Sequence, residues 1–267
     1  MIRDMTIGQF YNVDSVIHRL DPRVKIVITF VYIITLFIAR NPYLYLMAFL
    51  GLFIYIKLSK VPLKYIFKGL KALGLMITFT VLLNLFTVRG ADIILQWKVI
   101  RITQAGLLSA IYLGLRLIFM IIGSSMMTYT TTPTSLTDGL ERLLNWMKKI
   151  KVPVHEFAMI MSIAMRFIPI LVEELDKIMK AQTARGVDFN EGNVLKRLRK
   201  MVPILIPLFI SAIRRSDELA LAMDARCYHG GEGRTKMKPL RYTRRDGIAY
   251  TILVGYVVMM ILLAVKM

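Results

Sequence analysis

The stretch VKIVITFVYIITLFIA, residues 24–39, holds one charged side chain, Lys25 at its edge, and is otherwise almost wholly apolar. A helix needs roughly 20 mostly apolar residues to cross about 30 Å of membrane hydrocarbon. Further runs that approach or reach this length are residues 43–56, 72–88, 105–127 and 248–265. The sequence therefore predicts an all-α polytopic membrane protein with about five transmembrane helices.

The basic residues explain how the chain is oriented and divided. The net charge is +19, but residues 57–71 (KLSKVPLKYIFKGLK) concentrate lysine without any acid, which indicates a cytoplasmic loop rather than a nucleic-acid surface. The basic N-terminus is then cytoplasmic too. Three regions follow: residues 1–127 with the N-terminal segment and four transmembrane helices, a cytoplasmic or interfacial region over 128–246, and a final transmembrane helix over 247–267.

The five apolar runs contain no Asp, Glu or His. Proton- or ion-driven transporters use such groups inside the membrane, so a self-sufficient channel or secondary transporter is an alternative rather than the main interpretation. Arg116 lies near the middle of the fourth run, where we expect structural pairing within the protein, with a direct transport role as the second reading. Gly106, Ala110 and Gly114 put small residues on one face and predict close packing against another helix.

About three amphipathic helices are expected within residues 128–246. The first starts near Ser135, where Asp138 completes a spacing like that of a capping box, and lies on the membrane surface or under a soluble cap. The second opens at Pro153 and should be kinked or broken near Pro169, because proline removes a backbone hydrogen bond. The third follows Pro207.

The second and third of these helices end alike. One reaches Ala184-Arg185-Gly186, in which Gly186 is the expected left-handed cap residue, and the other reaches Ala225-Arg226-Cys227. The repeated proline-to-arginine layout predicts two struts that differ by about one helical turn. Arginine suits recognition at such tips, because its planar guanidinium makes several directional hydrogen bonds to carboxylate or carbonyl oxygens.

Together with the opening DSVIHRLDPRVK at 14–25, this pair of motifs resembles the transmembrane T-component (EcfT) of energy-coupling factor transporters, relatives of ABC transporters that import vitamins and metal ions in prokaryotes. In the opening segment we expect Asp21 to cap the first helix and Pro22 to start it. The resemblance implies a multi-pass protein of the prokaryotic cell membrane that carries no catalysis itself.

The resemblance also implies partners. Two cytoplasmic ABC-type ATPase subunits would dock on coupling helices that end in Ala184, Arg185 and Gly186 and in Ala225, Arg226 and Cys227, and a separate small membrane S-component would capture the substrate. Cys227 departs from the family's glycine, so the second helix could instead run on toward Gly230 and Gly231. Met159, Met161 and Met165 are candidates for an adaptable S-component surface, or else ordinary core residues.

A catalytic interpretation has little support in the sequence. There is no G-x-x-x-x-G-K-[ST] phosphate-binding loop, so ATP hydrolysis is expected in partner subunits, and no cofactor or metal is predicted. The remaining alternative is an integral-membrane enzyme acting on lipid or prenyl groups. Its candidate ligands or bases match no H-E-x-x-H spacing; they are His18, His155, His229, Glu173 and Glu174.

Overall fold

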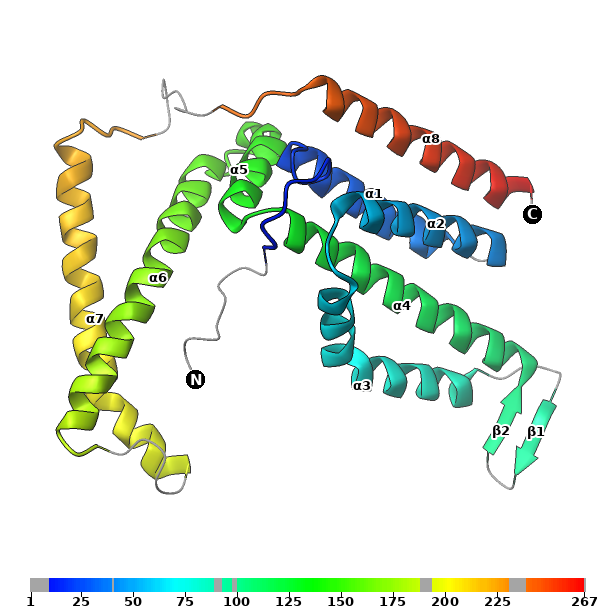
Figure 1. The fold of residues 1–267 in the computed structure, drawn as a ribbon, viewed down its shortest axis with the longest axis horizontal. Helices are drawn as coiled ribbons and strands as arrows, with labels where there is room; N and C mark the ends of the chain where they lie inside the picture. Colours follow the sequence, from blue (N-terminus) through cyan, green and yellow to red (C-terminus); the bar gives the residue numbers. More distant parts are fainter. Residues whose placement is uncertain are drawn as a thin grey trace. The chain divides into compact units, whose positions relative to one another are not determined.

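The computed structural model describes residues 10–39, 41–88, 93–97, 100–187, 194–230 and 239–266, most of them helical (Figure 1). The chain divides into two compact units. Residues 8–140 with 240–267 form one, called here the bundle unit, and residues 141–239 belong to the other, called the arm unit. The predicted all-α membrane fold is confirmed, apart from one short hairpin.

The helices of the bundle unit match the five apolar runs. They are α1 (Pro22–Ile38), α2 (Pro42–Ser59), α3 (Leu63–Thr87), α4 (Gln104–Thr130) and α8 (Arg244–Lys266). Four of these described helices, α2, α3, α4 and α8, are long and apolar enough to cross a membrane. The expected fifth span, α1, has 17 residues. At about 1.5 Å per residue it is about 26 Å long, so it is shorter than the other four.

The start of α1 follows the prediction made from Asp21 and Pro22. The Asp21 carboxylate accepts a hydrogen bond from the Arg23 backbone N–H at 2.9 Å, and Pro22 occupies the first helical position. Arg23 also donates from Nη2 to the Asp21 carboxylate at 2.8 Å. Its guanidinium lies 3.8 Å from the centroid of the Tyr242 ring, which comes from the segment before α8. The beginnings of α1 and α8 are therefore linked.

The core of the bundle unit lies between α1, α2, α4 and α8. Its buried side chains include Tyr32, Leu36, Leu44, Leu52, Phe119 and Met260. The small-residue face of α4 packs against α3, as predicted: a Cβ at Gly106 would stand 2.9 Å from the Val88 carbonyl oxygen, and one at Gly114 would stand 3.3 Å from Val81 Cγ2. Ala110 is buried between them.

Two segments that lie between the apolar runs have regular structure. The lysine-rich stretch 57–71 is mostly helical, since α2 ends at Ser59 and α3 begins at Leu63. The lysines at 64, 68 and 71 are spaced by four and three residues, a helical spacing that could have predicted the start of α3. The segment 89–104 contains an antiparallel hairpin of β1 (Ile93–Trp97) and β2 (Ile100–Thr103). Its isoleucines are the β-branched residues that favour strands.

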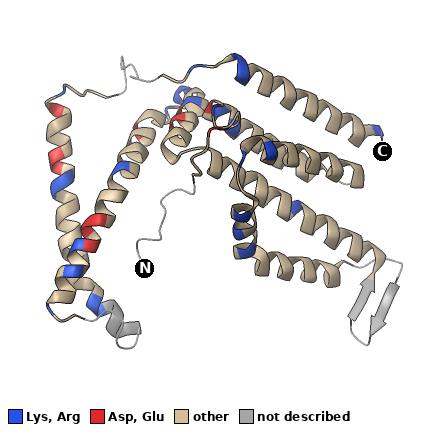
Figure 2. Cartoon of the chain, viewed as in Figure 1, with Lys and Arg blue, Asp and Glu red and all other residues tan. Residues whose placement is uncertain are grey.

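The basic residues of the bundle unit gather at one end of its helices. Figure 2 shows Lys and Arg where α1, α3 and α8 begin and where α2 ends. Tertiary hydrogen bonds join the same ends: the Lys25 ammonium donates to the Thr130 carbonyl oxygen at 2.7 Å, and Tyr129 Oη donates to the Tyr65 carbonyl oxygen at 3.1 Å. We call this the basic end of the bundle unit.

Arg116 makes the structural pairing expected of it. Its Nε donates to the Leu36 carbonyl oxygen and its Nη2 to the Ala39 carbonyl oxygen, both at 3.1 Å. These acceptors belong to the end of α1, whose last carbonyl groups lack partners within the helix and carry partial negative charge. Arg116 therefore fastens the end of α1 to the middle of α4.

We expect Arg116→Met to lower the free energy of unfolding by about 1–2 kcal/mol, because it removes two hydrogen bonds and leaves both carbonyl groups without this donor. Arg116→Lys keeps the charge but loses the forked geometry, so its free energy of unfolding should lie between those of wild type and Arg116→Met. Thermal unfolding in mild detergent measures the difference. Equal midpoints for all three proteins would contradict the assignment.

The connecting helix α5 (Pro133–Leu143) starts earlier than predicted, at Pro133 rather than near Ser135. Thr132, not Ser135, acts as the capping side chain, since its hydroxyl accepts a hydrogen bond from the Ser135 backbone N–H at 3.3 Å. The chain then passes through the 3₁₀ helix η2 (Leu144–Ile150) into α6 (Val154–Ala184), which Pro153 directly precedes.

Candidate functional site

The arm unit is built on two long helices, α6 and α7 (Val194–Asp224), each of 31 residues. They are antiparallel and cross one another (Figure 1). At the contact, Arg215 Nη2 of α7 lies 3.5 Å from Glu174 Oε2 of α6. Each helix is roughly 46 Å long at 1.5 Å per residue.

The prolines do not end these helices. Pro169 lies inside α6, and α7 starts well before Pro207 and also contains Pro203. A kink or a break was predicted at Pro169, and the continuous helix excludes the break; the predicted start of a helix after Pro207 is wrong. A proline ring costs one helical hydrogen bond and a local clash, which a kink relieves while the helix continues on both sides. The two predicted struts of unequal length are in fact parts of equal helices.

The end of α6 has the hydrogen bonds of a Schellman motif. The Gly186 N–H donates to the Thr183 carbonyl oxygen at 2.9 Å, and the Val187 N–H donates to the Gln182 carbonyl oxygen at 3.1 Å. Gly186 has φ = 89°, the left-handed conformation that glycine adopts without strain. The expected glycine cap is confirmed, and it makes Arg185 the last residue before the turn.

The end of α7 repeats this geometry with a cysteine in place of glycine. The Cys227 N–H donates to the Asp224 carbonyl oxygen at 2.9 Å, and the Tyr228 N–H donates to the Met223 carbonyl oxygen at 3.1 Å. Cys227 has φ = 55° and takes the left-handed position itself. The helix therefore does not run on toward Gly230, and Gly231 lies outside the described residues. Arg226 and Arg185 occupy equivalent positions.

Both motifs are exposed, from Ala184 to Gly186 and from Ala225 to Cys227. Because α6 and α7 are antiparallel, the two arginines lie at opposite ends of the crossed pair. A matched capping turn thus holds each guanidinium at the tip of a long helix, where a partner can reach it.

The left-handed cysteine gives a test with opposite signs at the two caps. We expect Cys227→Gly to raise the free energy of unfolding by about 1 kcal/mol, because glycine has no Cβ clash at positive φ. Gly186→Ala should lower it by a similar amount at the equivalent position. Thermal unfolding of both variants is the measurement, and shifts of the same sign would contradict the equivalence of the two caps.

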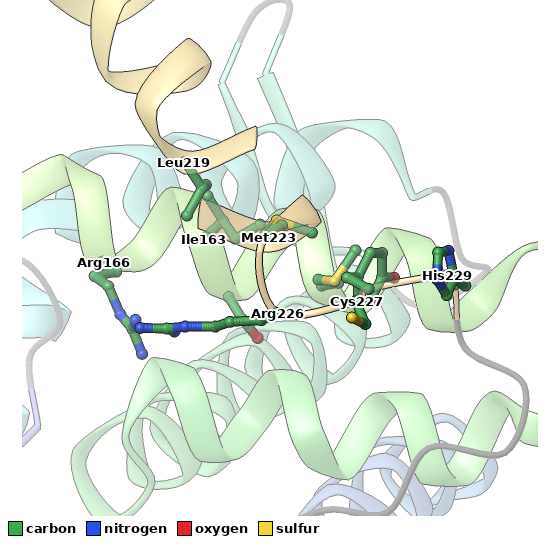
Figure 3. A pocket seen from close by; sticks show the side chains of 11 residues that line it. Ile163, Arg166, Leu219, Met223, Arg226, Cys227 and His229 are labelled. Atoms are coloured by element: carbon green, nitrogen blue, oxygen red, sulfur yellow. The ribbon is translucent and has the colours of Figure 1, made fainter. Parts of the chain in front are cut away.

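A pocket of about 610 Å³ lies beside Arg226, between the start of α6 and the end of α7. Its lining includes Ser162 and Arg166 from α6 and Met223 and Arg226 from α7. In Figure 3 the side chains of Arg166 and Arg226 extend toward one another. No Asp or Glu is among the described residues that line the pocket. Two cations whose described neighbours in the lining include no acid favour the binding of a carboxylate or another anion.

Arg166 was missed in the sequence. The available signal was its isolation, since it is the only charged residue between Glu156 and Glu173. Its neighbour in space, Arg226, was found only because its motif is repeated. Pairing the two required the antiparallel register of α6 and α7.

The three candidate methionines do not form one surface. Met159 lines the pocket beside Arg226. Met161 and Met165 are four residues apart on another face of α6, and all three side chains are half-buried. A larger apolar surface, which sequence analysis missed, lies on α7 and comprises the exposed side chains of Met201, Val202, Leu205, Ile206, Phe209, Ile210 and Ile213. We call it the α7 apolar face.

The residues considered for an enzyme are dispersed. His155 Nδ1 lies 2.9 Å from Glu141 Oε1, Glu174 pairs with Arg215, and His18 Nδ1 lies 2.7 Å from Ser15 Oγ. Burial lowers the pKa of His18. His229 lines the pocket beside Arg226. Within the described parts of the chain, no three His, Cys, Asp or Glu side chains are grouped so that they could hold a metal ion.

Apolar helices of membrane-spanning length, together with a crossed pair of amphipathic helices whose arginine-bearing ends are exposed, define a polytopic membrane protein. A family model described as CbiQ, cobalt transport protein, matches residues 14–237. The chain belongs to this family of transporter membrane proteins, which includes the EcfT proteins.

Similar proteins support the assignment over nearly the whole chain. The energy-coupling factor transporter transmembrane protein EcfT of Clostridium kluyveri is 52% identical over 250 residues, 93% of each chain. The protein of the same name from Ruminiclostridium cellulolyticum is 48% identical over 263 residues, 98% of each chain. That of Bacillus subtilis is 46% identical over 248 residues, 92% of this chain and 93% of its own.

Proposed function

We propose that this chain is the membrane scaffold and energy-coupling subunit of an energy-coupling factor importer for vitamins or other micronutrients in a prokaryotic cell membrane. One observation carries the proposal: Arg185 and Arg226 follow two helices of equal length and are held by the same capping turn. Equivalent tips suit two similar partners, here two cytoplasmic ABC-type ATPase subunits.

The proposed orientation places the basic end of the bundle unit, the N-terminus and the amphipathic region 128–246 on the cytoplasmic side. The concentration of lysine and arginine at that end supports this orientation by the positive-inside rule. The N-terminal segment with four spans over 1–127 and the last span over 247–267 anchor the region. No phosphate-binding loop occurs in the sequence, so the partners hydrolyse ATP and this chain is non-catalytic.

The ATPases would engage residues 184–186 and 225–227. A carboxylate from the partner at the second motif would be contacted by Arg166 as well as Arg226, because both line one pocket. The S-component would pack on apolar surface of the arm unit. The α7 apolar face offers more exposed area than the half-buried Met161 and Met165, so it is the main proposed contact, with Met159 turned instead to the pocket.

Copurification with tagged protein in mild detergent, read by mass spectrometry, tests the docking tips. Wild type should bring down two P-loop ATPase chains and a small hydrophobic protein. The double variant Arg185→Glu, Arg226→Glu should retain at least tenfold less ATPase, since charge reversal replaces attraction with repulsion. It should also lose substrate uptake in cells.

The matched control is Lys177→Glu, Arg214→Glu, which makes the same charge change at exposed positions within the same two helices. It should keep both ATPases. Equal loss of ATPase from both double variants would show that the effect comes from the change in net charge, and it would contradict the role of the tips. Wild type that purifies alone and moves solute into liposomes would favour a self-sufficient transporter instead.

A further inference from the structure

A second pocket lies at the basic end of the bundle unit, away from the arginine tips. It has a volume of about 490 Å³ and is formed by the segment before α1, the end of α2 and the start of α8. Four cations line it, Arg19, Lys57, Lys60 and Arg245, together with one acid, Asp14. The last turn of α2 and the first turn of α8 meet here, and both helices are candidate membrane spans, so this is the level at which spans of their length would leave the hydrocarbon region.

The single acid does not neutralise the pocket. Asp14 is engaged in an ion pair with Arg19 through both guanidinium donors Nε and Nη2. In the described part of the chain, Lys57, Lys60 and Arg245 form no ion pair with a carboxylate. The pKa of Asp14 is lowered, first by its hydrogen bond to Arg19 and then also by the charges of Lys60 and Arg245. The pocket therefore keeps an excess of positive charge.

The backbone fixes two of these cations. Lys60 follows α2 as its C-cap residue with φ = 56°, so the chain turns away from the helix at this residue. The side chain of Lys60 is among those that line the pocket. Arg245 lies in the first turn of α8. The helices α2 and α8 are neighbours, because the Tyr256 ring lies 3.5 Å from where a Cβ on Gly51 would stand. The cations thus come from adjacent helices at one level.

Apolar surface continues from the cations toward the middle of the helices. The exposed side chains of Ile54, Phe53 and Leu50 precede Lys57 by three, four and seven residues and therefore share its face of α2. On the Arg245 face of α8 lie Ile248 and Ile252, at least 62% exposed. Val16 and Leu58 add exposed apolar side chains in the pocket lining itself. A ligand that fits this arrangement has an anionic head and long apolar chains.

We propose that this pocket binds the phosphodiester headgroup of an anionic phospholipid, with the acyl chains lying along the exposed faces of α2 and α8. Lys57, Lys60 and Arg245 contact the phosphate oxygens, and Arg19 stays partly engaged with Asp14. Basic pockets between membrane helices are known to bind such headgroups, and each cation near the membrane surface adds to the attraction. The inference concerns lipid binding and is independent of ATPase docking.

Native mass spectrometry of the full chain tests the proposal, after incubation in detergent with equal amounts of phosphatidylglycerol and phosphatidylcholine. Wild type should retain phosphatidylglycerol at least tenfold over phosphatidylcholine. The variant Lys57→Gln, Lys60→Asn, Arg245→Gln should bind phosphatidylglycerol about tenfold to a hundredfold more weakly, since three cations are lost. Asparagine is used at position 60 because it tolerates left-handed backbone.

The matched control removes three cations from the start of α3 instead, as Lys64→Gln, Lys68→Gln, Lys71→Gln, and should bind within about twofold of wild type. A charge-conserving variant, Lys57→Arg, Lys60→Arg, Arg245→Lys, should retain the lipid. Equal losses in the pocket variant and the α3 control would overturn the proposal, and so would loss of binding in the charge-conserving variant.

Two measurements on wild type need no substitution. Raising the salt concentration should weaken phosphatidylglycerol retention and leave phosphatidylcholine unchanged. A large excess of inorganic phosphate should not displace the lipid, because the apolar faces of α2 and α8 hold its chains. Displacement by phosphate would identify a free-phosphate site and overturn the lipid assignment, as would equal retention of the two lipids.

Discussion

Replacing Asp246 with alanine is expected to lower the free energy of unfolding by about 3–5 kcal/mol, because this one carboxylate caps the starts of two helices. Its Oδ1 accepts a hydrogen bond from the Asp21 backbone N–H, before α1, at 2.9 Å. Its Oδ2 accepts from the Thr243 backbone N–H at 2.7 Å and from the Thr243 hydroxyl at 2.8 Å, before α8. Asp246 is only 1% exposed, so water does not replace the lost acceptor.

Graded substitutions separate the two contacts of Asp246. Asp246→Asn keeps one acceptor oxygen and should lose less than the alanine variant, whereas Thr243→Val removes one hydroxyl hydrogen bond and should cost about 1 kcal/mol. The measurement is thermal unfolding in detergent, with trypsin digestion of α8 as a local probe. An alanine variant as stable as Thr243→Val would show that the link to α1 contributes nothing.

Gly106→Ala is expected to destabilise the protein by about 2–3 kcal/mol, although alanine is the better helix former. Its Cβ would stand 2.9 Å from the Val88 carbonyl oxygen and 3.0 Å from the Leu85 carbonyl oxygen. Both neighbours are backbone atoms at the end of α3, so relief requires α3 and α4 to separate. That separation would also disturb the Thr103 hydroxyl, which donates to Val88 and caps Gly106.

Two other helical glycines are the controls for Gly106. A Cβ at Gly74 in α3 or at Gly255 in α8 meets nothing within 4 Å. Alanine at either position should be neutral or stabilising by up to about 1 kcal/mol, because it lowers the entropy of the unfolded chain. If the thermal midpoints fall equally for all three glycine variants, the effect at Gly106 comes from a general effect of alanine on membrane helices and not from close packing.

Sequence patterns predicted features that depend on neighbouring residues. The apolar runs located the membrane helices, Asp21 and Pro22 predicted the start of α1, and Gly186 predicted the end of α6. The caps depend on a few neighbouring residues, and the apolar runs add the same preference over many residues. The role of Arg116 also followed, because a cation among apolar residues requires acceptors that the protein must supply.

The failures arose where the preference of one residue was outweighed by the structure around it. A kink or a break was predicted at Pro169 and a helix start after Pro207, yet both 31-residue helices continue through their prolines despite the lost hydrogen bonds. Cys227 looked unsuited to a left-handed cap, but its strain is small beside the hydrogen bonds that close the turn. The pairing of Arg166 with Arg226 depends on helix register, which no short motif encodes.

The position of the Glu174–Arg215 ion pair has a mechanical consequence. Glu174 precedes Arg185 by the same number of residues as Arg215 precedes Arg226. The contact between the antiparallel helices is therefore equally far, in residues, from the two arginine-bearing helix ends. If the crossed pair turns as one rigid body about that contact, the two tips move through arcs of equal length in opposite directions.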